Sequence, residues 1–286
     1  MNRIRHNPRL LVIAASVFFT GMAACIKAAS PDIPLYELVF FRSAISALVL
    51  GLLLWGRKMD FRARNLSLLV TRSLSGFLAM SCNFYALGHL PFGDAAMLVS
   101  TFPIFVAVLS FLFLGERPTR SLWILIAASW AGILLILRPQ FHFWNFAGLI
   151  ALLAAVLSAV VVIVIHQSHE SDPSLRIAFY FTATCAFLAL PVMLQRFVTP
   201  NLRETLLLTA SGLLGTAGQI AITRAYGFEE VSRLAPLAYT GVVLSFLFGL
   251  IFWNEIPTAW SILGGSIVIL CCILIARREK PTPVIE

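Results

Sequence analysis

The pentapeptide Gly115-Glu116-Arg117-Pro118-Thr119 has a counterpart 139 residues further on, Asn254-Glu255-Ile256-Pro257-Thr258. The same shift gives 13 identities over the 63 positions from 76 to 138, without a gap. Because apolar chains match one another by chance more often than polar ones, the shared Glu-x-Pro-Thr is the stronger part of this evidence. The sequence therefore predicts two domains of one architecture, residues 1–139 and 140–286.

The composition indicates that these halves lie in lipid. Hydrophobic residues make up 59% of the chain and charged residues only 12%, whereas a soluble domain carries about 25% charged residues. The apolar runs are continuous rather than alternating, which favours helices over a barrel. We expect an all-α integral membrane protein with ten transmembrane helices as two inverted five-helix repeats. The expected spans are 10–29, 35–55, 66–88, 93–114, 120–137, 144–166, 174–195, 203–225, 231–253 and 258–276.

Five spans in each repeat place the second repeat upside down relative to the first, an arrangement that gives many carriers a gate at each face. With the N-terminus inside, the inner segments hold fifteen Lys and Arg residues and the outer segments four. Positive charge collects on the cytoplasmic side. We therefore expect a multi-pass protein of the inner (plasma) membrane, with both termini in the cytoplasm.

Several classes of function are not favoured. The net charge of +8 sits at the ends of spans rather than on one exposed stripe, so we expect no nucleic-acid partner. Nucleotide-binding loops, zincin signatures and hydrolase elbows do not occur in the sequence. We expect no cofactor, metal site or catalytic residue, and no enzyme. The cysteines all fall in apolar spans and read as small hydrophobic residues: Cys25, Cys82, Cys185, Cys271 and Cys272.

Short motifs around the repeat resemble a known family. The fourth span contains Ser100-Thr101-Phe102-Pro103 and ends in Leu114-Gly115-Glu116. With ten spans in two halves, this resembles the drug/metabolite transporter superfamily, EamA type. The second half ends the matching span in Trp253-Asn254-Glu255, where the family more often has Gly-Glu. The segments from Glu37 to Arg42 and from Arg72 to Gly76 resemble a branch that carries riboflavin, S-adenosylmethionine and other organic solutes.

This resemblance implies a secondary transporter that moves a small organic metabolite by alternating access. It also implies a central cavity lined by the first, third, fourth, sixth, eighth and ninth spans, with the fifth and tenth at the periphery. Proton coupling and exchange both remain as sources of energy. The alternatives are an exporter of amino acids or drug-like compounds by proton antiport, a non-transporting scaffold, a membrane enzyme and a channel.

Charged residues inside the spans are the first candidates for substrate binding, because a charge near the middle of a membrane helix costs at least about 2.5–3.5 kcal/mol. Arg42 and Arg72 would bind an anionic or π-rich group; the alternative is that each pairs with a carboxylate and holds helices together. Arg72, Gly76 and Asn83 share one helical face, which suits a cavity wall or close helix packing. Gln219 is the amide on the matching face of the eighth span.

A second group surrounds Pro103, which we expect to break the fourth span and free a backbone carbonyl. Ser100 and Thr101 precede this break, and Tyr239 is the counterpart of Ser100 in the second repeat. The pattern favours cavity lining and simple packing equally for these residues, with Tyr239 the best candidate for substrate binding.

The gating candidates are carboxylates near the ends of spans. Glu116 and Glu255 end the fourth and ninth spans, where negative charge opposes the helix dipole. A pair to an arginine that closes one side, or a polar anchor at the interface, therefore explains them better than helix stability does, with Glu116 at the inner face and Glu255 at the outer. Glu37 lies near the outer face, and Pro103 completes the gating group. Monomer and homodimer both remain open, since Ala128 and Gly132 form only a short small-residue face.

Overall fold

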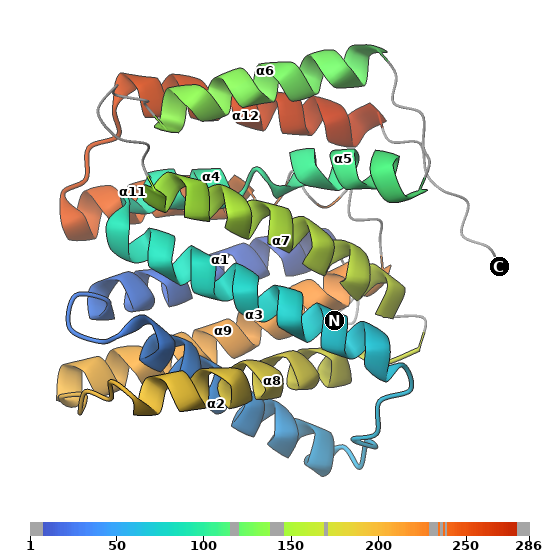
Figure 1. Ribbon diagram of the computed structural model, residues 1–286, viewed down its shortest axis with the longest axis vertical. Coiled ribbons are helices and arrows are strands. Elements are labelled where there is room, and N and C mark those ends of the chain that lie inside the picture. Colours follow the sequence, from blue (N-terminus) through green and yellow to red (C-terminus); the bar gives the residue numbers. More distant parts are fainter. Residues whose placement is uncertain are drawn as a thin grey trace.

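The computed structural model describes residues 8–114, 120–137, 146–168, 171–228, 234, 237 and 239–278, and these are helical with short connections (Figure 1). The all-helical prediction is confirmed. The helices are α1 Pro8–Ala29, α2 Leu35–Gly56, α3 Leu66–His89, α4 Phe92–Val99, α5 Phe102–Leu114, α6 Arg120–Leu137, α7 Phe146–Ser168, α8 Ser174–Leu194, α9 Leu202–Phe228, α11 Tyr239–Trp253 and α12 Ala259–Arg278.

Five described stretches are long and apolar enough to cross a membrane, and several further apolar helices are shorter. Large apolar side chains on the outside support burial in lipid: Trp55, Phe187 and Leu202 are 73%, 75% and 77% exposed. In water such a surface would be unfavourable, whereas hydrocarbon matches it.

The 139-residue shift also relates the helix boundaries. Helices end at Ala29 and Ser168, and begin at Leu35 and Ser174. Packing follows the same pattern: α1 packs against α9 while their counterparts α7 and α3 pack together, and α2 packs against its own counterpart α8. The contacts are therefore those expected of two equivalent units related by an approximate two-fold axis.

The fourth span is interrupted, as Pro103 predicted. The helix stops at Val99, and Thr101 Oγ1 donates to the carbonyl of Leu98 at 2.7 Å before α5 begins at Phe102. Pro103 thus sits in the first turn of a new helix, where its missing N–H has no intrahelical partner to lose.

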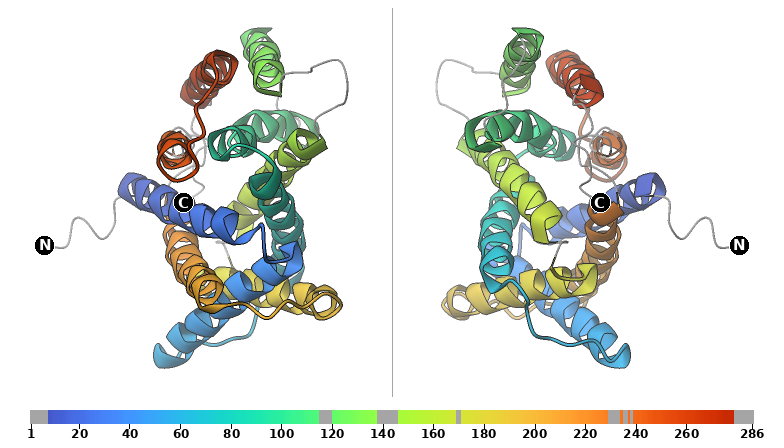
Figure 2. Two further views of the ribbon diagram at one scale, coloured as in Figure 1. Left: turned by 90° about the vertical axis from the view of Figure 1, so that its left-hand side faces the viewer. Right: turned by 90° about the vertical axis from the view of Figure 1, so that its right-hand side faces the viewer.

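The helices α6 and α12 form a peripheral pair, which lies side by side beyond the rest of the bundle (Figures 1 and 2). Gly132 and Gly264 allow the two backbones to approach, because a methyl group at Gly132 would lie 2.8 Å from the carbonyl oxygen of Gly264. The small face containing Gly132 therefore packs within the chain.

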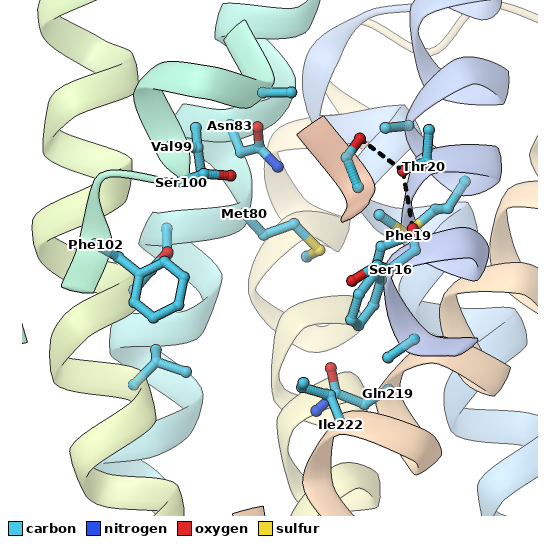
Figure 3. Close-up of a pocket in the computed structure, with 18 of the residues that line it drawn as sticks. Ser16, Phe19, Thr20, Met80, Asn83, Val99, Ser100, Phe102, Gln219 and Ile222 are labelled. Atoms are coloured by element: carbon cyan, nitrogen blue, oxygen red, sulfur yellow. Dashed lines mark hydrogen bonds between the residues drawn. The ribbon is translucent and has the colours of Figure 1, made fainter. Parts of the chain in front are cut away.

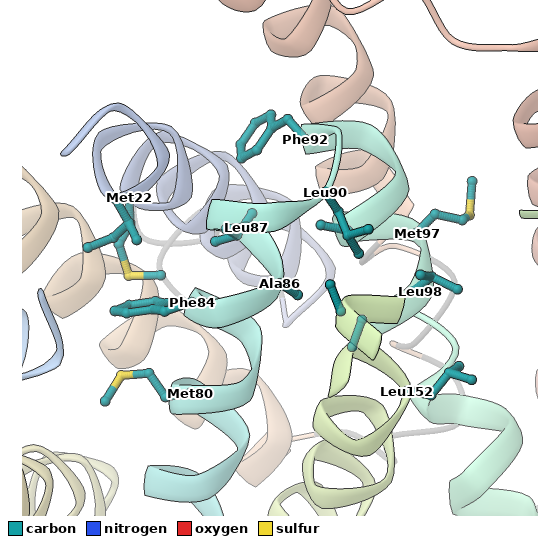
Figure 4. Packing of buried hydrophobic residues seen from close by; sticks show 14 of the residues in the cluster. Met22, Met80, Phe84, Ala86, Leu87, Leu90, Phe92, Met97, Leu98 and Leu152 are labelled. Atoms are coloured by element: carbon teal, nitrogen blue, oxygen red, sulfur yellow. The ribbon is translucent and has the colours of Figure 1, made fainter. Parts of the chain in front are cut away.

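Apolar side chains of α1, α3 and α4 pack together in one part of the bundle (Figure 4). Phe84, Leu87 and Leu98 are fully or almost fully buried there. Met22 and Met80, whose flexible side chains can fill gaps in a core, belong to the same cluster.

Loops of one repeat are held by polar residues of the other. Asp172 accepts hydrogen bonds from the N–H groups of Arg64 and Asn65 at 3.1 and 3.2 Å, and from Arg176 Nη1 at 2.8 Å. Arg176 also donates to the carbonyl of Asp60. Burial alone would raise the pKa of the Asp172 carboxyl, but these hydrogen bonds, that from Arg176 foremost, lower it below its usual value.

A related contact exists at the opposite end of the bundle. Glu37 Oε2 accepts a hydrogen bond from the N–H of Val198, in the loop between α8 and α9, at 3.1 Å. Glu37 and Arg176 are 139 residues apart. Equivalent positions in the two halves therefore each hold a loop of the other half, one with a carboxylate and one with a guanidinium.

Candidate functional site

A cavity of about 330 Å³ lies in the middle of the bundle, and helices of both halves line it. Figure 3 shows Asn83, Ser100 and Phe102 on one side of the space, and Thr20 and Gln219 on the other. All six spans implied by the resemblance contribute residues. Arg42 of α2 and Phe181 of α8 add the second and seventh spans to the wall.

Arg42 and Arg72 meet at one part of this wall. Each is only 2% exposed, and their guanidinium carbons lie 5.6 and 4.1 Å from the centre of the Phe181 ring. Within the described residues, neither arginine has a carboxylate at ion-pair distance. The alternative in which each arginine pairs with a neighbouring carboxylate therefore finds no support here.

Glycines make room for both guanidinium groups. A methyl group at Gly76 would overlap Arg72 Nη1 and lie 2.7 Å from Phe181 Cε2. A methyl group at Gly215 would lie 2.9 Å from Arg42 Nε. These glycines are 139 residues apart, so the same position in each repeat leaves space beside a buried charge.

The uncharged polar candidates divide into two groups. Asn83, Ser100 and Gln219 line the cavity, where Gln219 Nε2 donates to Thr223 Oγ1 at 2.9 Å. Thr101 and Tyr239 are buried but do not line it. Thr101 holds the end of α4 instead, and Tyr239 begins α11.

Glu255 forms an ion pair with a lysine. Its Oε1 lies 2.9 Å from Lys27 Nζ, and its Oε2 accepts the N–H of Phe92 at 2.6 Å. Lys27 Nζ also donates to the carbonyl of Leu90 at 2.7 Å. This cluster joins the end of α1, the α3–α4 connection and the segment after α11, at the end of the bundle that we expect to face outward. Glu116, the inner counterpart, lies outside the described residues.

Sequence reasoning missed two members of these clusters, Phe181 and Lys27. Phe181 is the counterpart of Arg42 at the 139-residue shift, and α2 and α8 pack together. The repeat could therefore have placed these two residues near one another. For Lys27, the signal was a single cation at the end of an otherwise apolar span.

Known proteins match most of the chain. The model of the EamA-like transporter family matches residues 8–138 and again 145–277. The pseudopaline exporter CntI of Pseudomonas aeruginosa is 36% identical over 95% of this chain and 96% of its own length. An S-adenosylmethionine uptake transporter of Rickettsia prowazekii is 26% identical over 86% of this chain and 84% of its own length. A solved crystal structure superposes with a TM-score of 0.68 at 20% identity, covering 96% of this chain and 99% of that one, which shows a shared fold.

Proposed function

The chain belongs to the EamA-like transporter family, and from this premise we propose a secondary carrier that moves a small organic metabolite across the inner (plasma) membrane by alternating access. The units that move relative to one another are residues 1–139 and 140–286. The observation that carries this proposal is the central cavity of about 330 Å³, which is lined from both halves. A cavity at the interface of two inverted repeats is where such carriers bind their solutes.

The Lys27–Glu255 cluster is the outer gate in this proposal, because it joins three segments beside the cavity by charge-assisted hydrogen bonds. Glu116, at the matching position of the first repeat, belongs to the inner gate. Both termini then lie in the cytoplasm. The exporter that is 36% identical supports export as the direction, and a proton gradient or exchange with a second solute supplies the energy.

Counterflow tests the carrier proposal and does not require the solute to be identified first. Liposomes with purified protein are loaded with an unlabelled small-molecule extract of cells and placed in the same extract labelled with ¹³C. Mass spectrometry then follows the entry of labelled solutes. We expect saturable entry of a small set of organic solutes, accelerated by the same solute inside. Entry no faster than in protein-free liposomes, or linear entry without acceleration, would contradict a carrier.

A further inference from the structure

The described residues of the cavity wall carry charge of one sign only. Among the described residues that line the cavity, Arg42 and Arg72 are the charged ones, and neither an acidic side chain nor a histidine is among the others. Both arginines are positive at any physiological pH. Among the side chains that the structure describes, a solute inside the cavity therefore meets two positive charges and no negative one.

Within the part of the chain that the structure describes, neither charge has a compensating carboxylate. The Nε and Nη1 atoms of Arg42 and Arg72 are buried without a hydrogen-bond partner among the described residues, and both guanidinium groups lie near the ring of Phe181. Burying a charge without a partner is strongly unfavourable, and two like charges near one ring add repulsion. Such an arrangement is expected where a binding site keeps its charges for a ligand rather than for stability.

We propose that Arg42 and Arg72 bind the oxyanion group of an organic anion, a carboxylate or a phosphate, and that this anion is the solute; the inference rests on the proposed carrier function. Guanidinium groups pair with both oxyanions through parallel hydrogen bonds. Organic cations without an oxyanion group are rejected, because they meet only repulsion.

The other residues of the cavity wall indicate the chemical character of the rest of the solute. Phe19, Phe102, Val161 and Ile222 make much of the lining apolar, while Asn83 and its polar neighbours provide a few hydrogen-bonding groups. The solute therefore carries an uncharged, partly apolar body on its anionic group. A pocket of this size and composition is typical of sites for small organic ligands.

The repeat indicates one positively charged part of the cavity wall rather than two, which favours a solute with one oxyanion group there. At the 139-residue shift Arg42 corresponds to Phe181 and Arg72 to Ser211, so the second half has no matching charges. Both arginines come from the first half, and the second half supplies the Phe181 ring that lies near both. The two halves thus differ where they meet, and this difference gives the cavity its charge selectivity.

The charge class of the transported solutes tests the proposal. In the counterflow experiment, we expect every exchanged solute to carry a carboxylate or phosphate, and the assignment of each mass identifies which. Exchange of solutes that lack an oxyanion group would overturn the inference and leave the carrier proposal standing. If nothing exchanges, the carrier proposal fails. The site is then tested by heating purified protein with the anionic and cationic fractions of the extract, and equal stabilisation by both would overturn it.

Substitutions separate binding from a structural role. We expect Arg42→Gln and Arg72→Gln each to lower exchange at least tenfold, while the unfolding temperature of the solute-free protein stays the same or rises. Arg57→Gln, at an exposed arginine after α2, should exchange at the wild-type rate. Arg42→Lys and Arg72→Lys keep the charge and should retain partial exchange with a raised KM. Wild-type exchange in the glutamine variants, or a lower unfolding temperature with unchanged KM in the lysine variants, would overturn the proposal.

Discussion

At the scale of the residue, the site depends on small side chains as much as on charged ones. Gly76 was expected on the cavity face with Arg72; the structure places it against the guanidinium group and the Phe181 ring, and it is not among the residues that line the cavity. Helical periodicity could predict that face because residues four apart lie one above the other. It could not predict Phe181, because a contact between helices depends on how α3 and α8 pack. Substrate binding by these residues stays a prediction.

Adding a methyl group beside an arginine should therefore impair transport. In Gly76→Ala and Gly215→Ala the new atom would push the guanidinium group of Arg72 or Arg42 away from its present position. The flexible arginine can move, so the fold should persist. Loss of one charge-assisted hydrogen bond to the solute, about 1.5–3 kcal/mol, corresponds to roughly ten- to hundredfold weaker binding. The KM for exchange measures this effect.

The matched control is Gly56→Ala, because no atom lies within 4 Å of a methyl group added there. Its KM should equal that of the wild type. An unchanged KM in Gly76→Ala and Gly215→Ala as well would show that the positions of the two arginines do not matter for the solute.

At the scale of the element, the connections between helices matter for the fold as well as the helices themselves. The break between α4 and α5 was predictable, since proline removes a backbone donor and blocks the preceding turn. The contacts of the α2–α3 connection with Asp172 and Arg176 were not, because they join residues more than a hundred positions apart. These contacts hold the two repeats together at one end of the bundle.

The Asp172 contacts give a test of stability against pH. Asp172→Asn should lower the unfolding temperature at pH 7 by about 5 °C, since it weakens charged hydrogen bonds that together contribute about 2 kcal/mol. The pKa of Asp172 is lower in the folded protein than in the unfolded chain. Its stabilisation is therefore fully present above the unfolded pKa of about 3.9 and is lost as the pH falls through the folded value.

Thermal unfolding of both proteins in detergent between pH 7 and pH 2 measures this difference. The difference in unfolding temperature between the wild type and Asp172→Asn should stay constant down to about pH 4 and disappear only below that pH. A difference that disappears between pH 7 and pH 5 would show that the carboxyl is not stabilised in its charged form.

At the scale of the whole molecule, the sequence predicted more of the fold than of the site. The expected spans 35–55 and 174–195 agree with α2 and α8 to within a residue, because proline breaks mark their starts. The ninth span was expected over 231–253, and the described helix there begins at Tyr239. Arg42 and Phe181 bring the second and seventh spans into the cavity wall, which depends on how the halves pack and not on periodicity.

The proposed topology is tested with single cysteines in a variant that lacks the five native ones. Arg62 lies in the exposed connection after α2 and Arg196 in the one after α8. A membrane-impermeant maleimide should label Arg196→Cys in intact spheroplasts, and Arg62→Cys only after permeabilisation. The reverse pattern would place both termini outside the cytoplasm.

The central claim is that a solute crosses through the cavity between two halves, with the Lys27–Glu255 cluster as the outer gate. The most direct measurement is exchange by the variant Lys27→Cys/Glu255→Cys, in the cysteine-free background, before and after treatment with a short, reducible bifunctional thiol reagent. We expect exchange to fall to the level of protein-free liposomes when the link forms and to return when a reductant cleaves it. Each single-cysteine variant, treated in the same way, should keep its exchange rate. Undiminished exchange with the two positions linked would contradict the account.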